Sequence, residues 1–399
     1  MRVTRLPKAE APVEPRYIRT LGLQSYDVDN LYPQNVRNII RSSKTGYGCL
    51  ERYSDYIEGR GLVSDALSLM RVNLNGETLA DVHSLESGDL AELNGFAIHV
   101  NYDINGRIVD MHHIPFENVR LCEPDEEGVV RQVALHPDWS GQATRGGKQV
   151  QVKKDNVDYI DVFNPDPVIV LSQMLEAGGP QYYKGQVYYY SREGHMQYTF
   201  AKFHAVLTDL STDEGLSNVQ LRNVRNNFLP AGAFVRLRGA GASVRLRGAG
   251  APLGDDESAQ VDQDYPEDLL ALQGDTEAVN IIDLTVESKE DIPEFLNFRG
   301  NNYDKEFTQT ASETKDCIYA AFGQEGWLAI RNGKVGFSGT LVADVERDYA
   351  KRCVKTQKAL TRAYLEILQN WAFNLPEEPT LAALSIRPLV ELNDPTSNE

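Results

Sequence analysis

A nine-residue unit that contains two arginines occurs twice in tandem, which brings four arginines together. The unit VRLRGAGAS spans residues 235–243, and VRLRGAGAP follows at 244–252. Guanidinium groups bind carboxylates and phosphates through paired hydrogen bonds. The repeat therefore predicts contact with an acidic protein surface or with DNA phosphates, although a short duplicated loop turning at Gly-Ala-Gly fits the pattern too. The candidate contact residues are Arg236, Arg238, Arg245 and Arg247.

A second basic segment, EGWLAIRNGKVGFSG, contains four glycines. Arg331 and Lys334 could meet phosphates there, and Gly333 and Gly336 would let the backbone move. The GxxxxGK[ST] spacing and a preceding strand are both missing, so nucleotide binding is excluded. A plain connection between two helices remains the alternative.

Other polar clusters give weaker signals. His99, His112 and His113 could meet across a hairpin, but no acidic or cysteine ligand is clearly on the same face, which favours ordinary strand histidines over a metal site. Acidic residues in predicted turns provide no catalytic pair; they are Asp27, Asp29, Asp103 and Asp110. A tyrosine-rich run suggests a strand edge or a subunit interface rather than base stacking; it comprises Tyr182, Tyr183, Tyr188, Tyr189 and Tyr190.

The overall composition limits the possible partners. With 40 basic and 58 acidic side chains in 399 residues, the formal charge is −18. Tight, sequence-specific DNA binding usually needs a basic surface. Since this chain is acidic, DNA is expected only as a non-specific partner. The four widely separated cysteines predict neither a disulfide framework nor zinc, and indicate a reducing assembly site. No apolar run suits a signal peptide or a membrane span.

The first half of the chain predicts an α+β domain. Apolar spacing indicates helices from about Asp29 or Asn30, over about 45–57 and over 79–94. Gly59 and Gly61 form a helix stop. Strands follow around 96–102 and 108–112, joined by the hairpin signal Asn105-Gly106.

The second half predicts long helices around a β-containing segment. A helix over 203–228 is expected to break near Gly215, a strand is predicted over 278–286, and helices over 293–322 and about 338–373. The last of these has an apolar face made of Leu341, Val345, Tyr349, Cys353, Leu360, Tyr364, Ile367 and Trp371.

In its order of segments the chain resembles the portal proteins of tailed bacteriophages. DNLYPQNVRNIIRSSKTGYGCLERYSDYIEGRGL and DLAELNGFAIHVNYDINGRIVDMHHIPFENVRL resemble the outer wing domain. LSNVQLRNVRNNFLPAGAFV resembles a helix descending through the stem to the clip, and SETKDCIYAAFGQEGWLA, GKVGFSG and YAKRCVKTQKALTRAYLEILQNWAF resemble the second stem helix, its loop and the long helix beyond. The chain departs from many portals at its C-terminus, where little sequence remains for a helical crown.

The resemblance implies an α+β, portal-like fold, with a wing of helices on a mostly antiparallel sheet, long stem helices flanking a small clip, and a long C-terminal helix. The implied segments are an arm (1–20), the wing (21–200), the first stem helix (201–228), the clip-like region with the repeat (229–292), the second stem helix (293–322), a tunnel-type loop (323–337), the long helix (338–375) and a short tail (376–399).

It further implies a non-catalytic ring of about a dozen copies at a capsid vertex of the virion, assembled in the cytoplasm of the bacterial host. The expected partners are further copies of the chain, double-stranded DNA passing non-specifically, the major capsid protein, the terminase large subunit and a head–tail adaptor, with no cofactor and no membrane. In that ring Arg331 and Lys334 would face DNA. The repeat would contact a subunit, for example at Asp255–Glu257, or an adaptor. The alternatives are another head–tail connector and, less favoured, an acidic carboxylate-based hydrolase.

Overall fold

The computed structural model describes residues 16–142, 144–145, 148–149, 151–225, 232–237, 281–286, 303–333 and 339–391. The surroundings of side chains are described for 16–142, 151–221, 307–333 and 341–391. The chain forms two compact units: the first contains Met1–Asp213 and Ser312–Glu399, and the second contains Glu214–Ala311.

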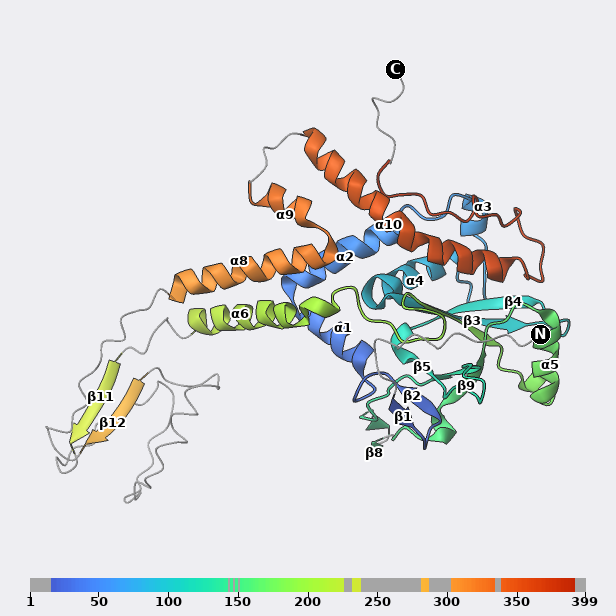
Figure 1. Cartoon of the computed structure of the whole chain (residues 1–399), viewed down its shortest axis with the longest axis horizontal. Coiled ribbons are helices and arrows are strands. Elements are labelled where there is room, and N and C mark those ends of the chain that lie inside the picture. Colours follow the sequence, from blue (N-terminus) through green and yellow to red (C-terminus); the bar gives the residue numbers. More distant parts are fainter. Residues whose placement is uncertain are drawn as a thin grey trace. The chain divides into compact units, whose positions relative to one another are not determined.

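A six-stranded sheet forms the centre of the first unit (Figure 1). Its order is β4-β3-β10-β9-β6-β5, and β10–β9 is the one parallel pair among these neighbours. This confirms the predicted mostly antiparallel sheet of an α+β fold. The strand bounds are β3 Gly95–Tyr102, β4 Ile108–Ile114, β5 Val119–Leu121, β6 Gln132–Leu135, β9 Asp158–Val162 and β10 Gln186–Ser191.

The predicted hairpin is confirmed at β3 and β4. Gly106 takes a φ of 77°, in the left-handed region that glycine adopts without a Cβ clash. The side chain of Asp103 closes the turn by accepting hydrogen bonds from the amides of Asn105 and Arg107.

Three helices of the first unit match the sequence pattern closely: α1 (Tyr32–Ser42), α2 (Lys44–Glu58) and α4 (Leu79–Leu93). Thr78 and Asp81 form a capping box at the start of α4. Gly59 ends α2 with a φ of 63°. The predicted cap of α1 was wrong, because Leu31 is its N-cap residue and makes no side-chain capping bond.

The long C-terminal helix α10 spans Gly339–Leu368 and ends earlier than predicted. Its predicted apolar face is largely confirmed. Five of its members are buried: Tyr349, Cys353, Leu360, Tyr364 and Ile367. Trp371 lies beyond the helix and forms a β-bridge with Ile108, at the start of β4.

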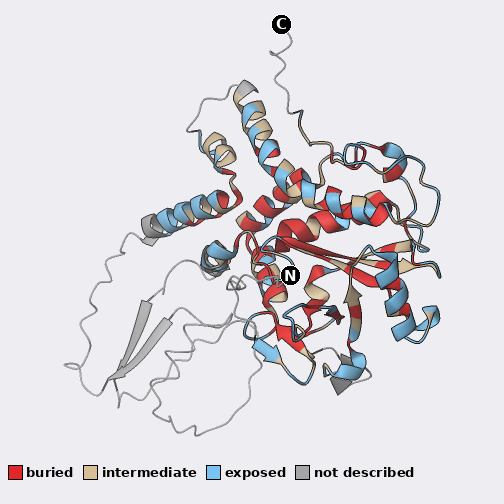
Figure 2. Cartoon of the chain, turned by 45° about the vertical axis from the view of Figure 1, so that its right-hand side comes forward, coloured by how far each residue is buried: buried red, intermediate tan, exposed pale blue. Residues whose placement is uncertain are grey.

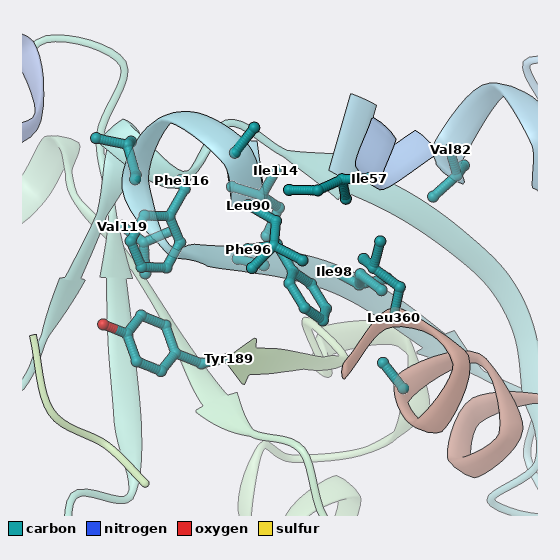
Figure 3. Packing of buried hydrophobic residues seen from close by; sticks show 14 of the residues in the cluster. Ile57, Val82, Leu90, Phe96, Ile98, Ile114, Phe116, Val119, Tyr189 and Leu360 are labelled. Atoms are coloured by element: carbon teal, nitrogen blue, oxygen red, sulfur yellow. The ribbon is translucent and has the colours of Figure 1, made fainter. Parts of the chain in front are cut away.

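The core lies where α2, α4 and α10 meet the sheet. Phe96 and Ile98 of β3, Leu90 of α4 and Leu360 of α10 belong to one buried cluster (Figure 3). Buried residues concentrate along these strands and the helix faces against them (Figure 2). Burying this apolar surface is the main favourable term in folding this unit.

Both passages between the two units run through helices. α6 (Leu207–Arg225) follows the short 3-10 helix η4 (His204–Val206) and contains the first boundary; α8 (Tyr303–Phe322) contains the second. The predicted break near Gly215 was wrong, since α6 continues through it. The start predicted for α8 at 293 lies outside the described residues.

Further corrections concern short segments. The stretch predicted as a loop over 323–337 contains the helix α9 (Glu325–Arg331). A helix that the sequence analysis did not predict, α5, spans Pro167–Glu176. In the tail the described residues form one isolated β-bridge, between Ile386 and Leu62.

The remaining described elements are β1 (Arg16–Ile18), β2 (Leu23–Ser25), α3 (Asp65–Ser68), η1 (Phe116–Asn118), β7 (Thr144–Arg145), β8 (Lys148–Gln149), η2 (Lys154–Asn156), η3 (Pro180–Tyr182), β11 (Gly232–Leu237) and β12 (Ile281–Val286). In the second unit β11 and β12 pair in parallel. None of the helices in the described ranges has the length and apolar character needed to cross a bilayer.

Candidate interaction sites

Two of the predicted DNA-facing residues, Arg331 and Gly333, lie at the end of α9. Arg331 is the last residue of that helix and is exposed. Gly333 follows with a φ of 64°, and its amide donates to the carbonyl of Ile330. Lys334 and Gly336 lie outside the described residues. The geometry therefore places one exposed cation at a helix C-terminus, where positive charge is favoured by the helix dipole.

Gln324 fixes the turn between α8 and α9. It is fully buried, and its amide nitrogen donates to the Cys49 carbonyl and to the Tyr349 hydroxyl, both at 2.9 Å. Its amide oxygen accepts from Arg52 at 2.8 Å. One side chain thus connects the α8–α9 turn to α2 and α10. No sequence pattern singled it out, because its partners on α2 are more than 200 residues away.

Trp327 secures α9 against the same two helices. Its ring makes edge contacts with Tyr56 at 6.0 Å and with Tyr349 at 4.9 Å between centroids. The guanidinium of Arg52 lies 5.1 Å from its centroid, within the range of a cation–π contact. Arg331 is therefore carried by a helix whose other end is held on α2 and α10.

The repeated arginines are described only at one position. Arg236 lies in β11, opposite Thr285 of β12. Arg238, Arg245 and Arg247, and their proposed partners Asp255–Glu257, lie outside the described residues. The contact predicted between these arginines and the acidic residues therefore stays a prediction.

The three hairpin histidines do not converge. His99 and His112 are cross-strand partners with ring centroids 6.5 Å apart, whereas His113 points to the opposite face because successive strand residues alternate. His112 contacts Asp110 at 2.9 Å. Within the described part of the chain no group of three or more histidine, cysteine or acidic side chains is placed to hold a metal ion.

His113 instead meets buried carboxylates of α4. Its Nδ1 lies 2.8 Å from Glu86 Oε1, and its Nε2 lies 3.5 Å from Asp89 Oδ2. Burial raises the pKa of Glu86 to about 8. Burial alone would lower the pKa of His113, but the hydrogen bond and charge of Glu86 raise it overall. The pKa of each group is therefore higher in the folded protein than in water.

Arg37 of α1 binds the adjoining acids. Its guanidinium lies 3.1 Å from Asp89, 2.8 Å from Glu92 and 2.7 Å from Glu117. Glu86, Asp89 and Glu92 recur at three-residue spacing on α4, a helical pattern that the sequence could have revealed. The charged groups of this largely buried network pair with one another across three elements, so the network cross-links α1, α4 and β4.

Several of the acidic residues and tyrosines singled out in the sequence make contacts within the fold. Asp29 accepts from the Leu31 amide and Asp103 closes the hairpin turn. A strand edge is wrong for Tyr188, Tyr189 and Tyr190, because β10 pairs with strands on both sides, and the alternative of a subunit interface stays a prediction. Tyr189 is buried and donates to the Gln197 carbonyl.

A cleft of about 520 Å³ lies between α5 and the ends of β5, β6 and β9. Glu123, Asp125, Asp161 and Glu176 give it four carboxylates, against one basic side chain, Arg131. Arg131 is itself paired with Asp125 at 2.6 Å. The cleft is therefore an acidic recess beside α5.

No protein-family model and no curated protein sequence matches this chain. The chain is similar to a solved structure titled "Neck of empty GTA particle computed with C6 symmetry", with 13% identity, a TM-score of 0.45, and coverage of 90% of this chain and 85% of that chain. A chain from "Virion of native gene transfer agent (GTA) particle" gives 13% identity, a TM-score of 0.44, and coverage of 86% and 82%. Likeness at this level does not assign the chain to a family.

Proposed function

We propose that this chain is the subunit of a portal-type ring at a capsid vertex, through which double-stranded DNA passes during packaging and ejection. The observation that carries the proposal is the path of the chain. It leaves a compact α+β unit through α6, forms a second unit with its own strand pair, and returns through α8 to α9 and α10. This is the order of wing, stem, clip, stem, loop and long helix in the portals that the sequence resembles.

The exposed faces of α6 and α8 support a role beside other copies. Of the described side chains on α6, Leu210 and Asp213 are buried, and Leu221 is 50% exposed. On α8, Phe307 is 40% exposed. Apolar side chains left open on long helices are suited to packing against neighbouring subunits.

Charge supports a conduit rather than a DNA-gripping protein. Each phosphate neutralised by a lysine or arginine adds binding free energy, which would slow a sliding duplex. A chain with a net charge of −18 avoids this. In the proposed ring Arg331 and Lys334 are the few cations of a tunnel loop, with Gly333 and Gly336 permitting movement. The arginine repeat is the docking surface for a neighbouring subunit or adaptor. The capsid protein and the terminase are the further partners.

The test is the assembly state of the purified chain. Native mass spectrometry and negative-stain microscopy should find closed rings of about a dozen copies with an axial hole. Phe307→Glu should reduce ring formation without unfolding the subunit, because a buried unpaired charge opposes association. Leu74→Glu is the matched control, since Leu74 is 98% exposed in a loop. A protein that stays monomeric at every concentration contradicts the proposal.

A further inference from the structure

The helix α5 is apolar on nearly every side, yet it is only partly covered. Val170 and Met174 are buried. Val168 is 73% exposed and Leu175 is 79% exposed, and Ile169 and Leu171 are each 38% exposed. A helix that is hydrophobic all round is normally buried. We call Val168, Ile169, Leu171 and Leu175 the α5 patch; α5 lies at the right-hand edge of Figure 1.

The α5 patch continues into the acidic cleft. Ile169, Ser172 and Glu176 of α5 line one side of the cleft, and Glu123 and Asp161 line another. A ligand for the combined surface must therefore bring apolar side chains for the patch and positive charge for the cleft.

The N-terminal segment of this chain has that composition. In residues 1–15 all three basic side chains lie within MRVTRLPKA (1–9), with Val3 and Leu6 between them, and two acidic side chains, Glu10 and Glu14, follow. Residues 253–280, also outside the described part, carry acidic side chains and no basic one. The charge of the cleft therefore favours the first segment over the second.

The described chain begins in the hairpin of β1 and β2, and the opposite end of that hairpin adjoins the cleft. Arg16 opens β1 and is the cross-strand partner of Ser25 in β2. Leu23 of β2 bridges to Cys122, and the Glu123 amide donates to the Gly22 carbonyl at 2.9 Å. Cys122 and Glu123 both line the cleft. The preceding 15 residues can extend to about 50 Å, so the segment reaches the whole surface.

We infer that residues 1–15 bind the α5 patch and the acidic cleft of their own chain. Val3 and Leu6 cover the patch, and Arg2, Arg5 and Lys8 pair with the carboxylates of the cleft. Attachment to β1 makes the contact intramolecular, and its effective concentration lets a weak contact stay formed. The inference does not depend on the proposed ring.

The test uses a labelled peptide of residues 1–15 and two forms of the protein, the full chain and one lacking residues 2–15. The peptide should bind the shortened protein with a Kd on the order of micromolar and bind the full chain at least about tenfold more weakly, because the native segment occupies the site. Raising the salt from about 0.05 to about 0.5 M should weaken binding, as screening of charge pairs requires.

Matched variants locate the site. Leu175→Glu in the shortened protein should weaken peptide binding by about tenfold or more, whereas Leu74→Glu, on an unrelated exposed loop, should leave it unchanged. A peptide in which Arg2, Arg5 and Lys8 are glutamine should also lose affinity. Thermal melting of each variant confirms that the protein remains folded.

A disulfide test separates contact within a chain from contact between chains. In a Cys317→Ser background, which removes the exposed native cysteine, Val3→Cys and Ser172→Cys should cross-link within one chain. Cross-links that join two chains overturn the inference, as does equal peptide binding to both forms or no binding to the shortened one. Tighter binding of a peptide of residues 235–252 would assign the site to the arginine repeat instead.

Discussion

Arg120 is completely buried and donates two hydrogen bonds to Asn30. Its Nε lies 2.7 Å from Asn30 Oδ1 and its Nη2 lies 2.6 Å from the Asn30 carbonyl. Asn30 has a φ of 60°, and its side-chain oxygen also accepts from the Tyr26 amide. The guanidinium lies over the rings of Tyr26 and Trp139, at 5.5 and 5.1 Å from the centroids. Burial lowers the pKa of Arg120 to about 10, so the group stays charged at neutral pH.

Arg120→Lys should therefore destabilise the first unit. A lysine cannot reproduce the planar set of donors to Asn30, and a buried charge that loses its partners costs about 3–5 kcal/mol. Urea unfolding monitored by circular dichroism measures this. Arg107→Lys, at a side chain that is 53% exposed, is the control and should change stability by less than about 0.5 kcal/mol. Equal effects of the two substitutions would contradict the role given to Arg120.

Two glycines that follow α2 should differ in their response to substitution by alanine, because only one of them has atoms close to the position of an added Cβ. Gly59 and Gly61 have φ values of 63° and 79°. A Cβ at Gly59 would lie 2.3 Å from the Arg387 carbonyl oxygen, whereas a Cβ at Gly61 meets nothing within 4 Å. Gly61→Ala should cost about 1 kcal/mol from the left-handed backbone, and Gly59→Ala about 1–3 kcal/mol more from the clash. Thermal unfolding of both variants tests this, and equal shifts in Tm would show that the tail does not pack there.

The pair of Glu86 and His113 should make the protein less stable as the pH rises. The folded-state pKa of each group lies above its ordinary value, and that of Glu86 is about 8. Stability from such groups is fully present below the unfolded-state pKa and is lost as the pH rises through the folded-state pKa. The free energy of unfolding should thus fall between about pH 5 and 9 by on the order of 1–3 kcal/mol. Glu86→Gln should flatten the profile, and an unchanged slope would refute this assignment.

Gln324→Leu should loosen the turn between α8 and α9. The substitution leaves the Cys49 carbonyl, the Tyr349 hydroxyl and the Arg52 guanidinium without the partner they have in the native protein. Buried polar groups left unpaired cost about 1–3 kcal/mol each, so we expect a loss of about 2–4 kcal/mol in chemical denaturation. Gln369→Leu, at an exposed position just after α10, should be nearly neutral.

Deletion of residues 244–252 tests the arginine repeat. If the repeat is a docking surface of the proposed ring, subunits should still close into rings, because the α6 and α8 faces remain. Adaptor binding in a pull-down, or DNA packaging in an assembly reaction, should fall. Unchanged packaging would leave the repeat as a spacer.

Local sequence determined most of the secondary structure. The Asn105-Gly106 turn, the ends of α2 and the buried stripe of α10 depend on residues within one or two turns of each other, so short-range patterns identify them. The α+β class followed from the change of period between α4 and β3. Strand alternation also separates His112 from His113, so the less favoured possibility that the three histidines meet is wrong.

Tertiary structure alone decided which polar groups meet. Arg120 lies in a three-residue strand whose pattern says nothing of Asn30, which is 90 residues away. Gln324 is 275 residues from Cys49, and the acids of α4 find His113 only when the sheet forms. A buried polar side chain needs a specific partner rather than a general apolar surrounding. That partner is fixed by how distant segments fold back on each other, which residue type and local spacing do not encode.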